Sequence, residues 1–421
     1  MKEKGIAIVG GGPAGLFAAL HASLAAKELG IFCQITIFER NERLGIKLLS
    51  TGGNQCNITR NATVEHMLDH YGEHGKFLRH ALHELSPDKT MAFFEQMGLP
   101  LVIREDNKVF PASFKARDVL GILLTRCTDA GITFHTNRRI TSVQHEQGMF
   151  QLYSEEILVD TVNELIISTG GKSYPRTGST GDGYTLAKSL GHSIITPKPA
   201  LCAVAVENSS IGNCSGISID NVGLSINWGA GKRRYFQGPL LVTHTGLSGP
   251  LILDCARYLS SGDTIEICWV PHSTGKVRTQ RQMEDELLSL CNRSGSLQVA
   301  TIIHRMGLPT KFVHWLLQEA NIDGDRKAAE VGRKVISPLA KLLAGQEFTI
   351  SLKGAFPQAM VTAGGVALEE IDPKTMQSKI IKGLYFAGEV VDIDGDTGGY
   401  NLQAAWSTGA LAGNSAIRHF T

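Results

Sequence analysis

The chain has 421 residues, which is enough for two or three domains with full-sized cores. Hydrophobic residues make up 43% and charged residues 19%, a balance that excludes extensive disorder. Lys and Arg number 41 against 40 Asp and Glu, and the basic residues are scattered along the chain. We therefore expect no nucleic-acid partner and no membrane partner. No pattern indicates an oligomeric state.

The eight cysteines contain no CxxC pair, which is typical of reduced thiols in a cytoplasmic protein. The first residues imitate a signal peptide, because Lys2 and Lys4 precede an apolar stretch. That stretch is interrupted by Gly10, Gly11 and Gly12, which a helical export signal disfavours. No later apolar run reaches the ~18 residues of a membrane span. The expected location is the cytoplasm.

The first forty residues follow the order of a dinucleotide-binding unit. A short apolar strand, Ile6–Val9, leads into the glycine turn Gly10–Gly15, which has the pattern GxGxxG. A helix is expected over Leu16–Leu29 and a second strand over Cys33–Phe38, with the acid Glu39 at its end. This order of strand, glycine turn, helix, strand and acid is the context that the dinucleotide fingerprint requires.

Each residue of this pattern has a physical task. Gly10 permits the tight turn, Gly12 lets the backbone approach a pyrophosphate, and Gly15 lets the helix pack closely on the strand. The start of the helix offers N–H groups to the phosphates. Glu39 can accept hydrogen bonds from both hydroxyls of an adenosine ribose. The first forty residues therefore predict a dinucleotide site.

Later segments favour FAD over NAD as the dinucleotide. A strand-like run over Val162–Ser168 ends in Thr169–Gly171, and Gly383–Glu389 repeats the order of strand, glycine and acid near the C-terminus. The stretch Gly398–Gln403 then opens a last helix, expected over Ala404–Arg418. A second GxGxxG is absent from the sequence, which mildly disfavours a separate nicotinamide site.

Six spaced blocks carry a family resemblance over nearly the whole chain. They are Gly45–Thr59, Val109–Asp118, Ser168–Tyr184, Thr243–Pro250, Val361–Gly365 and Gly383–Gly409. The sequence resembles the BaiN-like (YhiN-like) flavoproteins, which are also catalogued as the aminoacetone-oxidase family of FAD-binding enzymes. The resemblance implies an α/β fold: a Rossmann-like FAD-binding domain of the two-dinucleotide-binding-domain flavoprotein type, interrupted by an insert.

The expected insert covers residues 194–354, with a β-barrel over about 194–272 and 340–354 and a helical part over about 273–339. Residues 1–193 and 355–421 are expected to form the FAD domain. By resemblance, the late acid Glu389 holds the ribityl hydroxyls. The predicted cofactor-binding residues are Gly10, Gly12, Pro13, Ala14, Gly15, Glu39, Arg40, Lys47, Gly53, Asn57, Ile140, Thr169, Gly170, Gly171, Gly388, Glu389, Gly399, Tyr400, Asn401 and Leu402.

One loop departs from the family pattern. The family loop reads SGGGRCNxTN, whereas this chain has Asn54 in place of the third glycine and Gln55 in place of the arginine. Any chemistry that depends on that arginine is therefore in question here. The neighbouring Cys56 has no second thiol within a few residues, so a structural role is the default expectation.

Candidates for proton transfer are His244 and Tyr174, which lie in family blocks expected to border the flavin. His66, His70 and His74 have the spacing of one helix face, but no cysteine pair or HExxH accompanies them. We expect them on a solvated helix face, and we expect no metal site. The acidic run Asp392–Asp396 lacks the downstream Glu of a calcium loop, so a polar turn is expected.

The predicted function is an FAD-dependent oxidoreductase in which noncovalent flavin transfers a hydride to or from a small organic substrate. NAD(P)H is a possible electron donor. One alternative is an amine or amino-ketone oxidase that uses oxygen. Another is a flavin-binding regulatory or RNA-modification partner without small-molecule turnover. The neutral charge balance disfavours the nucleic-acid version of this alternative.

Overall fold

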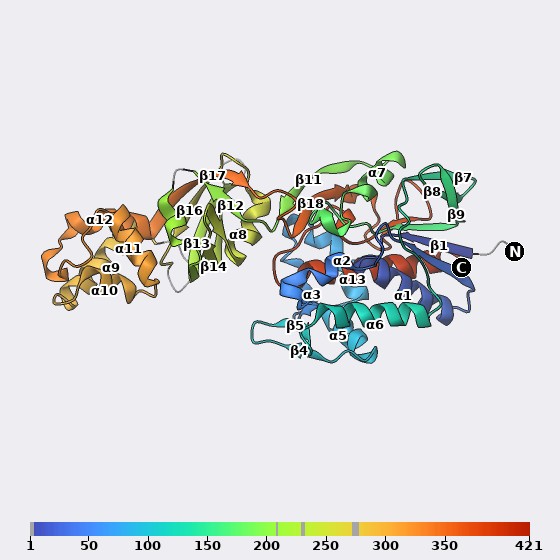
Figure 1. The fold of residues 1–421 in the computed structure, drawn as a ribbon, viewed down its shortest axis with the longest axis horizontal. Coiled ribbons are helices and arrows are strands. Elements are labelled where there is room, and N and C mark those ends of the chain that lie inside the picture. The colour runs from blue at the N-terminus through green and yellow to red at the C-terminus, as the bar shows by residue number, and fades with distance from the viewer. Residues whose placement is uncertain (1–3, 208, 229–231, 272–277) are drawn as a thin grey trace. The chain divides into compact units, whose positions relative to one another are not determined.

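The computed structural model describes residues 4–207, 209–228, 232–271 and 278–421. The chain forms two compact units, one of Met1–Pro199 with Ala359–Thr421 and the other of Ala200–Gln358. Figure 1 shows the first unit as an α/β layered structure and the second as a barrel followed by helices. The second unit thus interrupts the first in the sequence.

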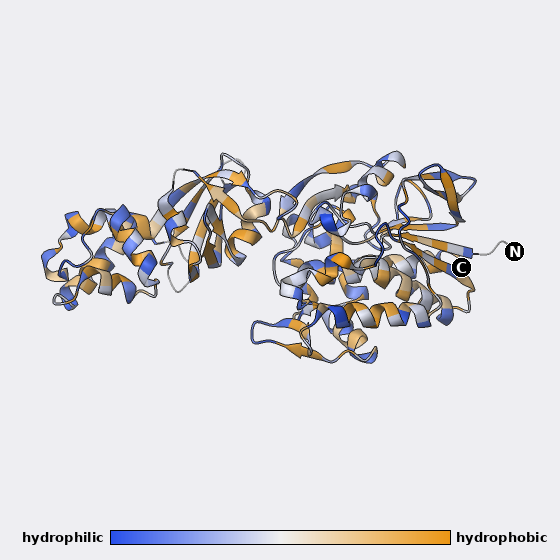
Figure 2. Cartoon of the chain, in the orientation of Figure 1, coloured by the Kyte–Doolittle hydropathy of each residue, from blue (hydrophilic) through white to orange (hydrophobic). Residues whose placement is uncertain are grey.

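The core of the first unit is a parallel sheet in the order β19-β10-β1-β2-β6. Apolar residues with little exposure fill its central strands, as expected for strands covered on both faces. Figure 2 shows hydrophobic colouring along these strands. The strands are β1 (Lys4–Val9), β2 (Cys33–Phe38), β6 (Thr133–His135), β10 (Glu164–Ile167) and β19 (Leu384–Phe386).

Two helices from opposite ends of the sequence pack together in the first unit. α1 (Pro13–Glu28) and α13 (Tyr400–Arg418) approach so closely that a Cβ added at Gly409 would lie 2.3 Å from the carbonyl oxygen of Ala14. A Cβ added at Gly413 would lie 2.2 Å from the carbonyl oxygen of Ala18. Glycine at these two positions therefore sets the helix separation.

Smaller elements surround this core. The other helices of the first unit are α2 (Ile46–Leu49), α3 (Val64–Leu68), α4 (Arg79–Glu84), α5 (Pro87–Gln96), α6 (Ala116–Asp129) and α7 (Asp182–Ser189), with 3-10 turns at Thr51–Asn54, Gly72–Leu78, Pro175–Thr177, Leu368–Glu370 and Gly388–Val390. Its other strands are β3 (Thr59–Arg60), β4 (Leu101–Ile103), β5 (Lys108–Pro111), β7 (Ser142–Glu146), β8 (Met149–Ser154), β9 (Ile157–Val162), β11 (Ile194–Ala200) and β18 (Val361–Val366). They form the sheets β3-β5-β4, β7-β8-β9 and β11-β18.

The second unit contains a closed barrel in the order β12-β15-β14-β13-β16-β17 and a helical layer, and buried residues of both belong to one apolar core. Its strands are β12 (Val204–Val206), β13 (Ser218–Trp228), β14 (Lys232–Val242), β15 (Gly246–Ser248), β16 (Thr264–Cys268) and β17 (Gln346–Lys353). Its helices are α8 (Pro250–Cys255), α9 (Gln280–Arg293), α10 (Val299–His304), α11 (Thr310–Glu319) and α12 (Arg333–Gly345), with 3-10 turns at Ser210–Cys214, Ala256–Tyr258 and Ala328–Glu330.

The predicted fold class is confirmed: a Rossmann-like domain of mixed α/β type accompanies a closed six-stranded barrel. Several expected bounds differ from the structure. Residues 194–199, expected in the insert, lie in β11 and pair with β18 of the first unit. The last helix begins at Tyr400 rather than at Ala404, because Gly399 in the left-handed conformation (φ 99°) caps it there. Within the described ranges, no helix is both long and apolar enough to cross a bilayer.

Candidate functional site

The turn after β1 requires glycine at two positions because of the protein's own packing. Gly10 has φ 109°, and a Cβ there would lie 2.6 Å from the carbonyl oxygen of Ser168. A Cβ at Gly15 would lie 2.0 Å from the carbonyl oxygen of Gly10. At Gly12, by contrast, a Cβ would meet nothing within 4 Å. The space beside Gly12 is therefore open and can admit a ligand.

The start of α1 faces that space. Pro13 occupies the first turn, where its missing N–H costs nothing, and Gly12 is the N-cap. No side chain caps the helix, so its first N–H groups remain available to an acceptor. Together with Gly12, this helix start can hold an anionic group such as a pyrophosphate.

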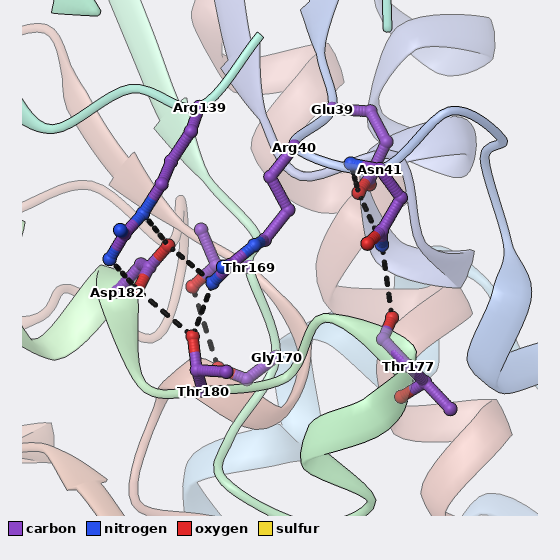
Figure 3. A network of polar contacts seen from close by, with 9 residues as sticks. All are labelled: Glu39, Arg40, Asn41, Arg139, Thr169, Gly170, Thr177, Thr180 and Asp182. Carbon is purple, nitrogen blue, oxygen red and sulfur yellow. Dashed lines mark hydrogen bonds and ion pairs between the residues drawn. The ribbon is translucent and has the colours of Figure 1, made fainter. Parts of the chain in front are cut away.

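Glu39 lies at the end of β2, next to β1 in the sheet. Its Oε2 accepts a hydrogen bond from the backbone N–H of Gly11 at 2.9 Å, and its Oε1 accepts from the backbone N–H and side-chain amide of Asn41 at 2.9 and 2.8 Å. Glu39 is only 9% exposed. These donors fix the carboxylate beside the glycine turn, where Figure 3 shows it pointing toward Asn41.

A second carboxylate lies on the other side of β1, in the segment after β19. Glu389 Oε2 pairs with Lys47 Nζ at 2.6 Å, and Oε1 accepts from the backbone N–H of Thr362 at 2.7 Å. Thr362 Oγ1 also accepts from the backbone N–H of Lys172 at 2.8 Å. A Cβ at Gly171 would lie 2.4 Å from Thr362 Oγ1 and 2.8 Å from Glu389 Oε1. Gly171, in the segment after β10, thus lets that segment pack closely against Thr362 and Glu389.

The third part of the site is the start of α13 with the segment before β3. Trp406 Nε1 donates to the carbonyl of Ile58 at 3.0 Å, and a Cβ at Gly399 would lie 2.7 Å from the backbone of Thr59. Asn57 Oδ1 is buried and has no hydrogen-bond partner within the described ranges. A buried acceptor without a donor is costly, so a ligand N–H or O–H would be favoured there.

In the loop where Asn54 replaces the family's third glycine, the backbone still adopts a left-handed conformation of the kind that favours glycine. Asn54 has φ 68°, and Asn is among the residues that tolerate this left-handed conformation. Gly53 has the same φ of 68°, and Cys56 has φ 58°. Cys56 is fully buried, and burial raises the pKa of its thiol to about 12. The thiol is therefore protonated and a poor nucleophile.

The expectation of one solvated helix face for the three histidines is wrong. His66 lies in α3, whereas Gly72 (φ 57°) interrupts the helical path, so that His74 falls in a separate 3-10 turn. His70 Nδ1 pairs with Asp396 Oδ2 at 2.8 Å, and the ring of His70 stacks on that of Tyr400 at 4.3 Å. These histidines therefore support the loop before α13.

The remaining predicted residues take these positions. Arg40 and Asn41 follow Glu39, Thr169 and Gly170 follow β10, Gly388 begins the turn after β19, and Asn401 and Leu402 lie in the first turn of α13. Ile140 is buried between β6 and β7. Tyr174 lies in the segment after β10 with φ 52°, and His244 lies in the second unit between β14 and β15. The parallel order β19-β10-β1-β2 brings all the glycine–acid segments to one sheet edge.

Sequence patterns missed three partners of this edge, namely Thr362, Arg139 and Asp182. Their contacts join segments that are far apart in the chain, and no spacing rule marks them. Among the described residues, no group of three His, Cys, Asp or Glu could hold a metal ion.

Comparison with known proteins agrees with this geometry. The model of the HI0933-like protein Rossmann domain matches residues 4–415. The chain belongs to this HI0933-like family. It is similar to a 3-dehydro-bile acid Δ(4,6)-reductase of Clostridium scindens, which is 28% identical over 98% of both chains. A ribosomal RNA dihydrouridine synthase of Haemophilus influenzae is 30% identical over 95% of both chains.

Among solved structures, the FrdA chain of Escherichia coli quinol fumarate reductase matches with a TM-score of 0.50 at 15% identity, over 99% of this chain and 70% of that chain. The family resemblance drawn from the sequence blocks is confirmed. The match to this family and to a reductase over nearly the whole chain supports the prediction of an FAD-dependent oxidoreductase.

The residues present fit FAD. The open space at Gly12 and the uncapped start of α1 suit a pyrophosphate, and the two fixed carboxylates, Glu39 and Glu389, suit the hydroxyl groups of a ribose and a ribityl chain. The buried acceptor of Asn57 lies in the segment that packs on α13. The order of these groups along the edge matches an extended dinucleotide.

Proposed function

We propose that this protein is a reductase that uses noncovalently bound FAD to saturate a carbon–carbon double bond conjugated with a carbonyl group in a small organic molecule. The observation that supports the substrate class is that two relatives are named for chemically similar reactions. One relative is named for reducing the Δ4,6 double bonds of a 3-dehydro-bile acid, and another for making dihydrouridine, which is the saturation of the uracil ring. Both double bonds are conjugated with a carbonyl, so both reactions add a hydride to one carbon and a proton to the next.

FAD supplies the hydride of such a reaction when it is bound. The chain's own groups bind and orient it. The glycine turn and the start of α1 would hold the pyrophosphate, Glu39 the adenosine ribose, and Glu389 with Lys47 the ribityl chain. The first turn of α13 would place N–H groups where negative charge accumulates during reduction. Tyr174 and His244 remain our candidates for delivering the proton.

Noncovalent attachment is supported by the state of Cys56, the thiol in the altered loop at Asn54. Covalent links to flavin go through nucleophilic side chains, and burial raises the pKa of Cys56 to about 12. We expect acid precipitation of the yellow protein to release FAD into the supernatant. Flavin that stays in the pellet, or an extract that contains only FMN, contradicts this part of the proposal.

The substrate class is tested by anaerobic flavin reduction and reoxidation. The protein is first reduced with NADH or NADPH, which we propose as the donor, and then mixed with an α,β-unsaturated ketone such as a 4-ene-3-oxo steroid. Return of the oxidised flavin spectrum with formation of the saturated ketone supports the proposal, and the matching saturated ketone is the control. Reduction of the flavin by amines, with reoxidation only by oxygen, favours an amine oxidase instead.

The dihydrouridine synthase name favours a second candidate, reduction of uridine in RNA by the same chemistry. The balanced charge, with 41 Lys and Arg against 40 Asp and Glu, favours the small molecule. An additional sample in the same experiment receives unmodified ribosomal RNA. Reoxidation by RNA with dihydrouridine formation, and none by the ketone, selects the second candidate.

A further inference from the structure

A cluster of charged side chains joins the segment after β10 to the ends of two other strands. Asp182, the first residue of α7, accepts two hydrogen bonds from Arg139, whose Nε lies 2.9 Å from Oδ2 and whose Nη2 lies 2.8 Å from Oδ1. Arg40 Nη1 lies 2.9 Å from the same Oδ2. Arg40 also donates to the hydroxyl of Thr180. Figure 3 shows both guanidinium groups directed at Asp182.

Segment 170–182, which ends at Asp182, loses much conformational entropy when it becomes ordered. Gly170, Tyr174, Gly178 and Gly181 all have left-handed φ values, of 73°, 52°, 98° and 87°. Its regular structure is limited to the short turn Pro175–Thr177. Glycine-rich backbone loses more conformational freedom on ordering than other sequences do, so this segment depends on its attachments.

The path of the segment explains why its attachment matters. It leaves the end of β10 and reaches Arg40 and Asn41 at the end of β2, and β1 lies between these two strands in the sheet. Asn41 Nδ2 bonds both Glu39 Oε1 and the carbonyl of Thr177, at 2.8 and 3.1 Å. The segment therefore passes the glycine turn after β1 and adjoins the carboxylate expected to hold the adenosine ribose.

Asp182 has the charge state needed to hold segment 170–182 through ion pairs. Burial acts to raise the pKa of its carboxyl, but hydrogen bonds from Arg139 and Thr180 and the charge of Arg40 outweigh it and hold the pKa below its ordinary value. Asp182 is 15% exposed, while Arg40 and Arg139 are 30% and 53% exposed. A carboxylate paired with two guanidinium groups is a stronger link than an isolated surface ion pair.

We propose that Asp182 is a positioning residue that, through Arg40 and Arg139, fastens segment 170–182 beside the adenosine end of the FAD site and thereby slows the dissociation of FAD. This role rests on the proposed cofactor site. Asp182 itself need not touch FAD, because it acts by holding the segment that adjoins Glu39.

The test compares FAD dissociation from purified variants, followed by the rise of free-flavin fluorescence after dilution. Asp182→Asn is expected to release FAD about tenfold faster than wild type, the ratio that corresponds to about 1.4 kcal/mol. Arg139→Gln leaves the Arg40 pair in place and is expected to release FAD about threefold faster. High salt is expected to speed release from wild type more than from Asp182→Asn, since ion pairs are screened.

Two controls separate this role from general stability. Asp88→Asn also removes a carboxylate from the first turn of a helix, α5, and is expected to release FAD at the wild-type rate. Asp182→Glu keeps the charge and is expected to restore most of the slow release. The melting temperature of each apoprotein is measured beside the rate.

Wild-type FAD release from Asp182→Asn overturns the proposal, as does equal acceleration in Asp182→Asn and Asp88→Asn. If Asp182→Asn does not fold, Arg139→Gln and the salt dependence decide: a wild-type rate in Arg139→Gln together with salt-insensitive release overturns it. A wild-type protein that binds no FAD contradicts the cofactor site itself and is recognised before any variant is compared.

Discussion

Two buried carboxylates lie at opposite ends of the same parallel sheet and have different surroundings. Glu39 follows β2 and accepts hydrogen bonds from Gly11 and Asn41. Glu164 begins β10, is only 3% exposed and pairs with His419 Nδ1 at 2.8 Å. Burial raises the pKa of Glu164 to about 8, against smaller opposing effects of Tyr385 and Lys382.

The difference follows from strand direction. At the carboxyl ends of parallel strands, the chain turns into loops and helix starts whose N–H groups point at whatever lies there. At the amino end of β10, Glu164 instead pairs with the side chain of His419, which comes from the last residues of the chain. The same residue type is therefore proposed to accept hydrogen bonds from a ligand at one edge, and it holds a proton at the other.

The largest expected effect comes from closing the space at the carboxyl edge. Gly12→Val is expected to weaken FAD binding by at least about 100-fold, because its side chain occupies the position where backbone meets pyrophosphate. A Cβ there meets nothing within 4 Å, so the apoprotein should still fold. FAD titration and circular-dichroism melting measure the two effects.

Gly15→Val is the contrasting variant, since its Cβ would lie 2.0 Å from the carbonyl oxygen of Gly10 and should prevent folding. A folded Gly12→Val protein with its full complement of FAD would show that this turn is not the phosphate site.

The next effect concerns the carboxylate at that edge. Glu39→Ala is expected to weaken FAD binding by about 1–3 kcal/mol, the range for lost charge-assisted hydrogen bonds. Isothermal titration of the apoprotein with FAD measures the change. Glu95→Ala, on the exposed side of α5, is the matched control and should bind FAD as wild type does. Equal affinities in the two variants argue against a ribose contact by Glu39.

At the amino edge, the expected effect is on stability rather than on FAD. The pKa of Glu164 rises from an ordinary 4.5 to about 8 on folding, so the native state holds a proton that the unfolded state has lost. This contribution is complete below the unfolded pKa and disappears as the pH rises through about 8. Burial lowers the pKa of His419, so His419 is neutral above its ordinary value of 6.5.

Between about pH 6.5 and pH 8, the wild-type apoprotein should therefore lose about 1–2 kcal/mol of unfolding free energy that Glu164→Gln does not lose. Urea unfolding at several pH values measures the slope. Parallel pH profiles for the two proteins would contradict a protonated Glu164.

The smallest effect is expected at Lys47. Its ion pair with Glu389 has side-chain exposures of 23% and 20%, so Lys47→Met should change the unfolding free energy by less than about 1 kcal/mol. FAD binding should become less sensitive to salt. Lys188→Met, at an exposed position on α7, serves as the control. A loss of FAD affinity as large as that expected for Glu39→Ala would show that Lys47 contacts FAD directly rather than only orienting Glu389.

The sequence predicted the carboxyl edge better than the rest of the molecule, for a physical reason. Gly10, Gly15 and Glu39 are recognisable because the turn and its acid lie within one continuous unit with fixed spacing. Asp182 and Arg139 meet only because β10 and β6 belong to one sheet, which no local pattern encodes.

Two further differences have the same origin. His70 is polar and spaced like a helix-surface residue, yet its partner is Asp396, 326 positions later. The insert is expected from residue 194, whereas the second unit begins at Ala200, because the extended residues 194–199 complete a two-stranded sheet with β18, which follows the insert in the sequence.

Two glycines of α13 affect which parts of the chain can change without disturbing the carboxyl edge of the parallel sheet. Gly409 and Gly413 allow α13 to pack directly against the backbone of α1. The starts of α1 and α13 therefore belong to one closely packed pair of helices. The distance between the glycine turn after β1 and the start of α13 is thus fixed within the first unit. A chain built this way can exchange or lengthen the residues between β11 and β18 without changing the distance between the two helix starts.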